Sequence, residues 1–429
     1  MIKITIFLLS AFSIFFCNAQ TPVGIQWQRC LGGFSNDFSY CVKNTSDGGY
    51  ILVGQTQSNN GDVTGNNGGD DIWVVKTGAT GNIQWQKCLG GTGQDPLGIF
   101  WGENSGSIQQ TNDGGYILVG NTLSNDGNVT GNHGGRDIWV VKLNSTGVIE
   151  WQKCYGGTGD EFSGNILQTA DNGYIFTGST TSNNVNVIGN HGGSDGWVVK
   201  IDNAGNITWQ KCLGGTNDDV ISKINIGNNG GYICAGYSSS NNGNVSGNHG
   251  GYDMWVIKVN SVGTLQWQKC IGGDEFDAGH RIIPYNNTSY LILGETGSID
   301  GDFTGLPPQS GDILLNIDLS GNILWNYSFT ECCNDSYGWS LLNTSDGGIL
   351  AGSVTQNLIN QFSNYHGSYD INLTKFNPQS SGISLIENSE SQVCKIFDLL
   401  GKETIKQVNQ IQFYRYENGS VEKVYIVQP

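Results

Sequence analysis

Short apolar runs separated by glycine, asparagine and aspartate recur along most of this chain. The first set predicts four strands, at residues 38–43, 50–56, 72–76 and 83–88. β-Branched and aromatic residues fill these runs, as strands prefer. The turn at residues 45–49 contains Asp-Gly, which supplies the positive backbone angles of tight hairpins. No segment has a helical period, so the sequence predicts an all-β protein.

The strand pattern belongs to one unit that is copied six times. Its marker is the tryptophan of the stretch Ile-Gln-Trp-Gln-Arg-Cys-Leu-Gly-Gly at residues 25–33, which returns as Trp27, Trp85, Trp151, Trp209, Trp267 and Trp325. The separations are 58, 66, 58, 58 and 58 residues, so the second copy carries an eight-residue insertion, within residues 96–106. A period of this size indicates a repeat architecture.

The number of predicted strands indicates how the array closes. Five copies have four strands, whereas the sixth ends after its third strand near Phe376, and an unattached fourth strand, residues 25–30, precedes the first copy. A terminal strand that completes the last sheet is typical of a closed ring of four-stranded sheets. The sequence therefore predicts a six-bladed β-propeller over residues 20–376, closed by the N-terminal strand.

The repeated motifs WQKCLGG, DGGYILVG, GNHGGxD and WVVK resemble a family of bacterial propeller-like repeats over roughly four fifths of the chain. A vaguer likeness to Kelch repeats, through Gly-Gly followed by Tyr and Trp, supports the architecture only. Neither resemblance implies a particular activity.

The end of the chain has a different composition. Residues 377–392 are expected to form a linker, and residues 393–429 a small β-domain with a hairpin at Asn418-Gly419. The segments DLLGKE and FYRYENGSVEKVYI resemble the C-terminal sorting domain of type IX secretion in the Bacteroidetes phylum. The resemblance rests on Asp398, Leu399, Leu400, Gly401, Lys402, Glu403, Tyr416, Asn418, Gly419 and Lys423. It implies the type IX secretion machinery as a partner; the alternative is a small structural cap.

The start of the chain has the three parts of a secretory signal peptide, predicted at residues 1–19. Lys3 is followed by an apolar run at residues 4–16 and by Cys-Asn-Ala before Gln20. The run is short for a bilayer span, and no other stretch approaches its length. The mature chain is therefore expected to lack a transmembrane segment and to be secreted or held at the outer cell surface, through the periplasm. Cys17 leaves a lipoprotein signal as the alternative.

Charge and cysteine usage narrow the possible partners. The formal net charge of −17 argues against nucleic acid, because phosphate binding needs clustered lysine and arginine. Export permits disulfides, but five cysteines occupy equivalent places in successive copies, too far apart to bridge. These are expected to be small buried hydrophobes: Cys30, Cys88, Cys154, Cys212 and Cys270. The state of Cys332 and Cys333 is left open.

Candidate binding residues fall on the long loops, which alternating strand direction places on the face opposite the tight turns. His133, His191 and His249 occupy one equivalent loop position, and ligand binding and turn packing are the alternatives for them. They would ligate a metal only by converging on the ring axis, so no metal is expected. Phe100 and Trp101 lie in the insertion and are expected either to bind a glycan or protein ligand or to plug the channel mouth.

Repeated acidic residues are better explained by structure than by chemistry. An aspartate precedes every predicted third strand and is expected to hold backbone donors of a turn: Asp71, Asp137, Asp195, Asp253, Asp312 and Asp370. The acid pairs Asp160-Glu161 and Asp274-Glu275 resemble those of glycosidases, but the other copies also carry an acid there. Loops such as Asn60-Gly61-Asp62 leave calcium open, although the spacing of an EF-hand is absent; no other cofactor is expected.

No catalytic signature occurs in the sequence: there is no Gly-x-Ser-x-Gly, no phosphate-binding loop, no dinucleotide fingerprint and no His-Glu-x-x-His. The expected function is a non-catalytic scaffold for binding, adhesion or interaction. The alternatives are an extracellular polysaccharide-acting enzyme and a spacer without a specific ligand. An enzyme should break the repeat with unique polar groups at one channel mouth, whereas a scaffold should keep its loops alike.

Overall fold

The computed structural model describes residues 30–97, 106–228, 230–306, 311–328, 340–343, 349–355, 370–376, 393–397, 403–404, 411–416 and 421–425. The chain divides into two compact units, Met1–Gly338 and Trp339–Pro429. The described strands of the first unit come from the first five copies of the repeat, and those of the second unit from the sixth copy and the C-terminal segment.

The first unit contains five four-stranded antiparallel sheets, in each of which the strands lie in sequence order. The first two sheets are β1 (Asp37–Asn44), β2 (Tyr50–Thr56), β3 (Asp71–Thr77) and β4 (Ile83–Leu89), then β5 (Ser107–Gln110), β6 (Tyr116–Thr122), β7 (Asp137–Leu143) and β8 (Ile149–Tyr155). The next two are β9 (Glu161–Gln168), β10 (Tyr174–Thr180), β11 (Asp195–Ile201) and β12 (Ile207–Leu213), then β13 (Asp219–Ile226), β14 (Tyr232–Ser238), β15 (Asp253–Val259) and β16 (Leu265–Ile271). The fifth is β17 (Asp277–Asn286), β18 (Ser289–Thr296), β19 (Asp312–Asp318) and β20 (Ile323–Ser328). A single 3₁₀ turn, η1 (Gly301–Phe303), interrupts the described strands and loops. The predicted all-β class and four-stranded sheets are therefore confirmed for five copies.

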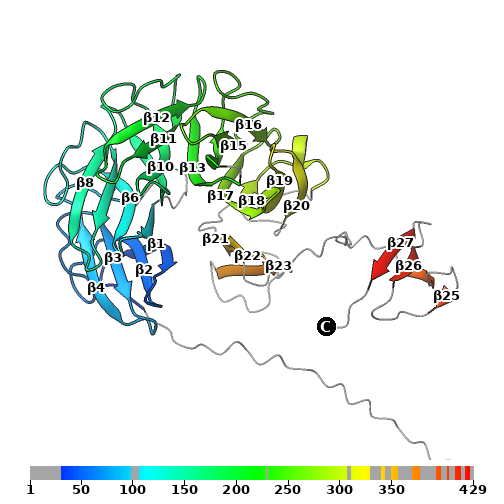
Figure 1. The fold of residues 1–429 in the computed structure, drawn as a ribbon, viewed down its shortest axis with the longest axis horizontal. Coiled ribbons are helices and arrows are strands. Elements are labelled where there is room, and N and C mark those ends of the chain that lie inside the picture. Colours follow the sequence, from blue (N-terminus) through cyan, green and yellow to red (C-terminus); the bar gives the residue numbers. More distant parts are fainter. Residues whose placement is uncertain are drawn as a thin grey trace, which may run out of the picture. The chain divides into compact units, whose positions relative to one another are not determined.

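Successive sheets follow one another in an arc within the first unit, with their first strands on the inner side and their fourth strands on the outer side (Figure 1). The first strands β1, β5, β9, β13 and β17 contact one another in turn. This is the blade arrangement of a β-propeller. Pro284 lies in β17, on the inner edge where no further strand needs the missing N–H. We use "blade" for each of these five sheets.

The hydrophobic cores lie between adjacent blades. In β7, Trp139 and Val141 belong to a cluster with Ile51 and Ile72 of the first blade, whereas Ile138 and Val140 face the third blade. The third strand is covered on both faces, and every residue of β7, β11 and β15 is buried. This explains why the WVVK motif reads as a continuous apolar run rather than as an alternating one.

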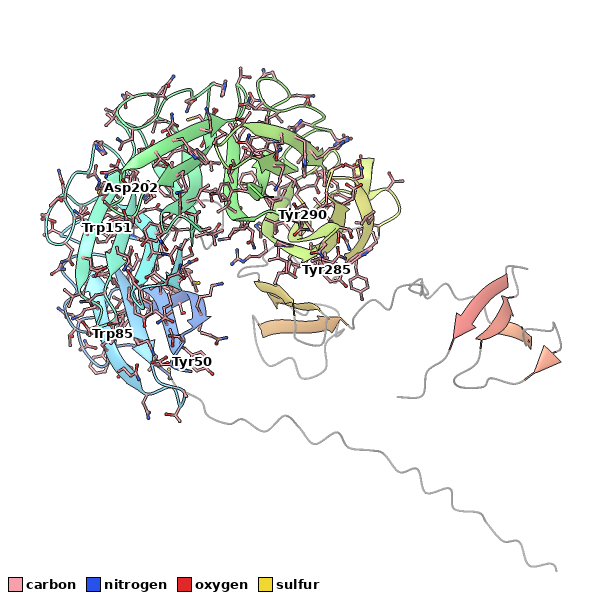
Figure 2. The ribbon with its side chains drawn as sticks, in the orientation of Figure 1. Tyr50, Trp85, Trp151, Asp202, Tyr285 and Tyr290 are labelled. Carbon is pink, nitrogen blue, oxygen red and sulfur yellow. The ribbon has the colours of Figure 1, made fainter. Side chains whose placement is uncertain are left out.

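The repeat tryptophans join each blade to the next along the outer rim. The ring of Trp85 lies 5.6 Å from that of Tyr116, centroid to centroid, and a Cβ added to Gly147 would lie only 2.8 Å from Trp85. Trp151 has the same relation to the third blade, through Tyr174 and Gly205. Figure 2 labels Trp85 and Trp151 on the outer strands.

Tight turns lie on the face opposite the long loops, as predicted, and in the first four blades each is held by a buried lysine of the third strand. Lys76 Nζ lies 2.9 Å from Asp47 Oδ2, and Lys200 Nζ lies 2.8 Å from Asp171 Oδ2. The glycine after the aspartate has a positive φ of 78° at Gly48, whereas Asn172 takes this place in the third copy, with φ 62°. The fourth copy differs, because its lysine, Lys258, donates to the backbone oxygen of Gly230 at 2.7 Å.

The second unit contains two sheets. The sixth copy forms a three-stranded sheet of β21 (Ser340–Asn343), β22 (Ile349–Thr355) and β23 (Asp370–Phe376), so it has three strands as predicted. The C-terminal segment forms a sheet in the order β25-β24-β26-β27, from β24 (Val393–Phe397), β25 (Glu403–Thr404), β26 (Ile411–Tyr416) and β27 (Val421–Tyr425). β26 pairs antiparallel with β27, as a hairpin at Asn418-Gly419 requires. Residues 25–29 of the predicted closing strand lie outside the described residues.

Four of the five repeat cysteines meet the expectation of buried free thiols, namely Cys88, Cys154, Cys212 and Cys270. Cys30 is also a free thiol but is exposed, which corrects the prediction for the first copy. It stands outside any strand of the described chain. Among the described residues, no helix is long and apolar enough to cross a membrane.

Candidate functional site: the long-loop face and its blade junctions

An acid holds the crossover that enters each blade; it begins the first strand in every blade but the second, where the insertion separates Asp95 from β5. Asp95 Oδ2 accepts a hydrogen bond from Gly91 N at 2.7 Å and another from Ser124 Oγ at 2.7 Å, and Asp95 Oδ1 accepts one from Thr122 Oγ1. The backbone N–H contact of the glycine recurs at Asp37, Glu161, Asp219 and Asp277. Glu161 therefore serves loop structure, as the repeat predicted, and is occupied by these donors.

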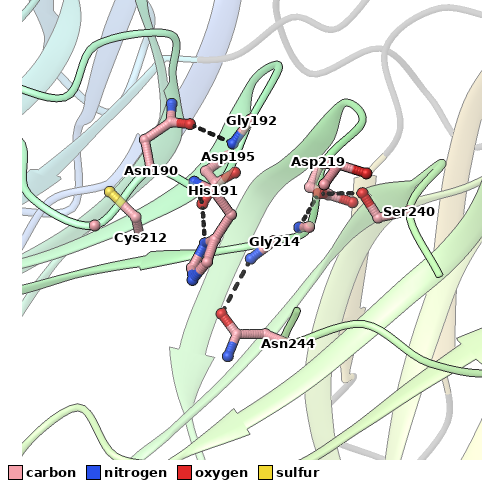
Figure 3. Close-up of polar contacts among 12 residues, drawn as sticks. Asn190, His191, Gly192, Asp195, Cys212, Gly214, Asp219, Ser240 and Asn244 are labelled. Atoms are coloured by element: carbon pink, nitrogen blue, oxygen red, sulfur yellow. Dashed lines mark hydrogen bonds and ion pairs between the residues drawn. The ribbon is translucent and has the colours of Figure 1, made fainter. Parts of the chain in front are cut away.

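A second buried acid begins each third strand and holds the long loop. Asp195 Oδ2 accepts the His191 backbone N–H at 3.2 Å and lies 2.6 Å from the His191 Nδ1 atom (Figure 3). His133 and Asp137 repeat this geometry at 2.6 Å, and His249 and Asp253 at 2.7 Å. In the first blade Asn67 replaces the histidine, and only its backbone N–H reaches Asp71. The predicted turn-holding role of these aspartates is confirmed in four blades.

The two acids of neighbouring blades converge on the first glycine of each crossover. A Cβ added to Gly90 would lie 2.4 Å from Asp71 Oδ1 and 2.6 Å from Asp95 Oδ2, and one added to Gly214 would lie 2.7 Å from both Asp195 Oδ1 and Asp219 Oδ2. Only glycine fits between two carboxyl groups at this distance. The first glycine of the CLGG motif is therefore required by interblade packing.

The convergence places buried carboxyl groups where their ionised form is poorly solvated. Burial, followed in part by the charge of the neighbouring acid, raises the pKa of Asp71 to about 6. Burial likewise raises the pKa values of Asp195 and Asp277 to about 6. The Oδ1 atoms of Asp71, Asp137 and Asp195 accept no hydrogen bond from the described residues. Each blade junction is thus an acid pair that favours protonation.

Polar grooves open at the blade junctions on the outer side of these acid pairs. The groove between the second and third blades has a volume of about 450 Å³ and is lined by His133, Gln152, Lys153, Cys154, Asn186 and Asn206, among others. An equivalent groove of about 450 Å³ lies between the fourth and fifth blades, lined by His249, Gln268, Lys269, Cys270, Asp302 and Asn322. Each lining residue lies 116 residues after its counterpart. The groove therefore recurs at equivalent places of two blade junctions.

The predicted histidines combine the two alternatives, turn packing and exposure to a possible ligand. His133 and His249 line separate grooves while their Nδ1 atoms are held by buried aspartates. They pack the turn through one nitrogen and face a groove with the rest of the ring. His191 has the same aspartate contact in the third blade. Each histidine of this set holds its own aspartate, so the three form no common metal site.

The remaining candidates are placed as follows. Phe100 and Trp101 lie outside the described residues, and so do Asp398, Gly401, Lys402, Asn418 and Gly419. Glu403 begins β25, Tyr416 ends β26 and Lys423 lies in β27. The side-chain Oδ1 of Asn60, in the suggested calcium loop, accepts a hydrogen bond from the backbone N–H of Phe34 at 2.8 Å. Among the described residues, no three His, Cys, Asp or Glu side chains are grouped to hold a metal ion.

Sequence reasoning missed an aromatic cluster on the long-loop face between the fourth and fifth blades. Tyr237, Tyr252 and Phe276 contact one another, with ring centroids 5.6 to 5.7 Å apart. The signal was present in the repeat, because the places of Tyr252 and Phe276 are taken in the third and fourth blades by Ser194 and Asp218. This cluster is the clearest break of the repeat among the described loops.

The grooves contain no activated nucleophile among the described groups. Burial, followed by the charge of a nearby aspartate, raises the pKa of the Cys154 and Cys270 thiols to about 12, so they stay protonated at neutral pH. A histidine held by a buried aspartate occurs in hydrolases. Here the histidine–aspartate pair occurs in three copies, and in two described grooves it lies near a protonated thiol. Such repetition is expected of a pair that holds the loop.

Comparison with known proteins gives no family: no family model matches the chain, and no curated protein matches it. Solved structures resemble it at low scores. A subtype N10 neuraminidase-like protein of A/little yellow-shouldered bat has a TM-score of 0.43 and 11% identity, over 82% of this chain and 96% of that one. Puromycin hydrolase has a TM-score of 0.43 and 10% identity over 89% of this chain, which spans 50% of the hydrolase. A Synechocystis apocarotenoid oxygenase has a TM-score of 0.34 and 13% identity, over 75% of this chain and 88% of that one.

Proposed function

We propose that the mature chain is a secreted or cell-surface, non-catalytic β-propeller that binds an extracellular glycan or protein through the grooves along its outer rim. The observation that carries this proposal is the recurrence of one polar groove, lined from equivalent positions, at two blade junctions 116 residues apart. Equivalent grooves on a rigid array suit a repetitive ligand, because several weak contacts made together give a high effective affinity. Calcium is the one cofactor candidate, and the described residues contain no His, Cys, Asp or Glu group that would hold it.

We propose a non-catalytic role because the acids and histidines of the long loops already make structural hydrogen bonds. The acids at the strand entries are hydrogen-bonded to loop donors, and the histidine–aspartate pair is the same in three blades. A polysaccharide-acting enzyme is the alternative, and a spacer without a ligand is the second. Release of reducing ends from a glycan during the binding screen described below would establish the enzyme and overturn the scaffold.

Closure into a six-bladed ring is part of this proposal. In four successive pairs a repeat tryptophan packs on a turn glycine of the next blade, and in three of them the spacing is 54 residues: Trp151 with Gly205, Trp209 with Gly263, and Trp267 with Gly321. Trp27 and Gly81 have the same spacing of 54. The N-terminal strand would therefore be placed as the fourth strand of the sixth blade, with Trp27 over the first blade.

The closure is tested by comparing two tryptophan variants. Trp27→Ala should lower the free energy of unfolding by about as much as Trp151→Ala, roughly 3 kcal/mol, because both rings would fill equivalent blade junctions. Urea unfolding of the mature chain measures both. A Trp27→Ala protein as stable as the parent, beside a weakened Trp151→Ala protein, would exclude closure by this strand.

Export through the periplasm by type IX secretion completes the proposal. It is supported by the signal-like residues 1–19 and by the four-stranded C-terminal sheet that carries the sorting-domain resemblance. Deleting residues 393–429 should leave a folded repeat array in the periplasm of the native host. Surface delivery of the truncated chain at parental levels would contradict the sorting assignment.

The binding role is tested by a screen of the mature chain against glycan and extracellular protein arrays. A ligand of the grooves should bind less tightly to a Lys153→Ala, Lys269→Ala double variant, because both lysines line described grooves. Lys43→Ala, on the inner strand β1, serves as the matched control. Binding to no array member, or binding equal in all variants, would count against the groove as the ligand site.

A further inference from the structure

The aromatic cluster at the junction of the fourth and fifth blades is an exposed surface as well as a packing unit. Tyr237, at the end of β14, is buried, Tyr252 is half-buried, and Phe276 is 37% exposed. Tyr252 and Phe276 pair in an isolated parallel bridge that joins the loop before β15 to the crossover before β17. Backbone pairing therefore fixes the two outer rings, and we call these three residues the aromatic patch.

Acidic side chains surround the aromatic patch. Asp274 and Glu275 are exposed and immediately precede Phe276. The Tyr252 hydroxyl is hydrogen-bonded to the side chain of Asp218. The backbone N–H of Asp274 donates to Asp300 Oδ1 at 3.0 Å, which anchors the acidic segment to the next long loop. An aromatic face with a rim of carboxylates attracts cations through the ring quadrupole and through charge.

The second and third blades show what fills the equivalent place elsewhere in this chain. The Arg136 guanidinium lies 4.9 Å from the centroid of the Phe162 ring, and Arg136 occupies the position of Tyr252 in its own copy. The Arg136 backbone N–H donates to Asp160, which occupies the position of Phe276. One junction thus supplies its own cation to an aromatic ring. At the other, no lysine or arginine of the described chain lies over Tyr252 or Phe276.

We propose that the aromatic patch binds a cationic group from outside the chain, specifically a lysine or arginine side chain of a basic protein segment. This inference rests on the proposed binding function and narrows its ligand at this place to a protein. The formal net charge of −17 favours a basic partner over a neutral glycan, because long-range attraction and the acidic rim act in the same direction. A neutral sugar stacked on Phe276 is the competing occupant.

The test uses the mature chain and two synthetic decapeptides, one alternating lysine and glycine and the other alternating glutamate and glycine. Calorimetric titration at low and high salt should show binding of the lysine peptide only, weakening as salt screens the charges. Phe276→Leu keeps an apolar side chain but removes the π face, and should weaken binding about threefold. Phe38→Leu changes an exposed ring of the first blade and should leave binding unchanged. Thermal unfolding checks that all proteins are folded.

Different outcomes separate this inference from the proposed function. Equal binding of the lysine peptide to the parent and to folded Phe276→Leu would overturn the aromatic patch as a cation site. Binding of a neutral oligosaccharide that is lost in Phe276→Leu and insensitive to salt would assign the patch to sugars instead. In either case the grooves could still bind in the array screen, whereas failure of that screen alone would leave the patch result standing.

Discussion

The Nδ1 atom of His191 lies 2.6 Å from Oδ2 of Asp195, whose side chain is completely buried. The same oxygen also accepts the backbone N–H of His191, so a single residue makes two contacts to the acid at the entrance to the third strand. The first blade keeps the backbone part of this arrangement with Asn67. The side-chain contact is therefore an addition to a backbone motif.

Removing the imidazole tests how much this addition stabilises the blade. His191→Ala should lower the free energy of unfolding by about 1 to 3 kcal/mol, because a buried carboxylate loses a hydrogen bond partner. His191→Asn, the residue of the first copy, should lose less. Equilibrium unfolding in urea at pH 6 measures both, and an alanine variant as stable as the parent would show that the backbone contact suffices.

The acid pairs predict a stability that falls as pH rises. The folded-state pKa values of Asp71, Asp195 and Asp277 are raised from 3.8 to about 6, so the folded chain binds protons more tightly than the unfolded chain between these values. Their stabilising contribution is complete below about pH 4 and is lost as pH rises through about 6. A hydrogen bond from Lys200 lowers the pKa of Asp171 to about 2, and that contribution is lost only in stronger acid. The temperature of thermal unfolding should be highest between about pH 4 and 5.

Asp71→Asn isolates one acid pair. The amide keeps the acceptor for the Asn67 backbone N–H but carries no charge beside Asp95. We expect the variant to gain roughly 2 kcal/mol at pH 7.5 and little at pH 4.5. Asp47→Asn, in an exposed turn on the other face, should show no such gain. A stability that changes equally at both pH values would contradict the assignment.

The fourth tight turn lacks an acid for its buried lysine. Lys258 is 5% exposed, burial lowers its pKa, and its hydrogen bond goes to the Gly230 carbonyl. Asn229→Asp restores the sequence of the turns that pair with Lys76, Lys142 and Lys200, and should stabilise the chain by about 1 kcal/mol at pH 7. The reverse change, Asp171→Asn, should destabilise it. Calorimetry measures the melting temperatures of both variants. A shift in the same direction for Asn229→Asp and Asp171→Asn would contradict this prediction.

Gly263 and Gly247 form a matched pair for the packing of the repeat tryptophan. Both have positive φ, 79° and 84°, but a Cβ at Gly263 would lie 2.7 Å from Trp209, whereas one at Gly247 meets no atom within 4 Å. Both alanine variants carry the backbone strain, about 1 kcal/mol. Gly263→Ala should cost a further 1 to 3 kcal/mol from overpacking. Equal urea midpoints for the two variants would show that Trp209 moves aside freely.

The sequence predicted what depends on periodicity and turn chemistry. Strand bounds near those of β2, the faces of the tight turns and the turn-holding role of Asp71 and its equivalents all followed from the repeat. The partners across blade junctions did not follow, because Asp71 and Asp95 meet only once two sheets are packed face to face. The aromatic patch was missed for a similar reason, since Tyr237 and Phe276 are 39 residues apart. A comparison of equivalent positions between copies would have marked Tyr252 and Phe276 as departures.

The outer tryptophans of the first four blades each pack on the following blade, so mechanical load would be carried from one junction to the next. Once the closing N-terminal strand is pulled away, stretching the array should remove blades one at a time, as in linear repeats with nearest-neighbour coupling. Each event would release one repeat of 58 residues, a contour of about 200 Å. A protein built in this way would yield in steps under shear, and would lose one blade while its remaining junctions stay joined.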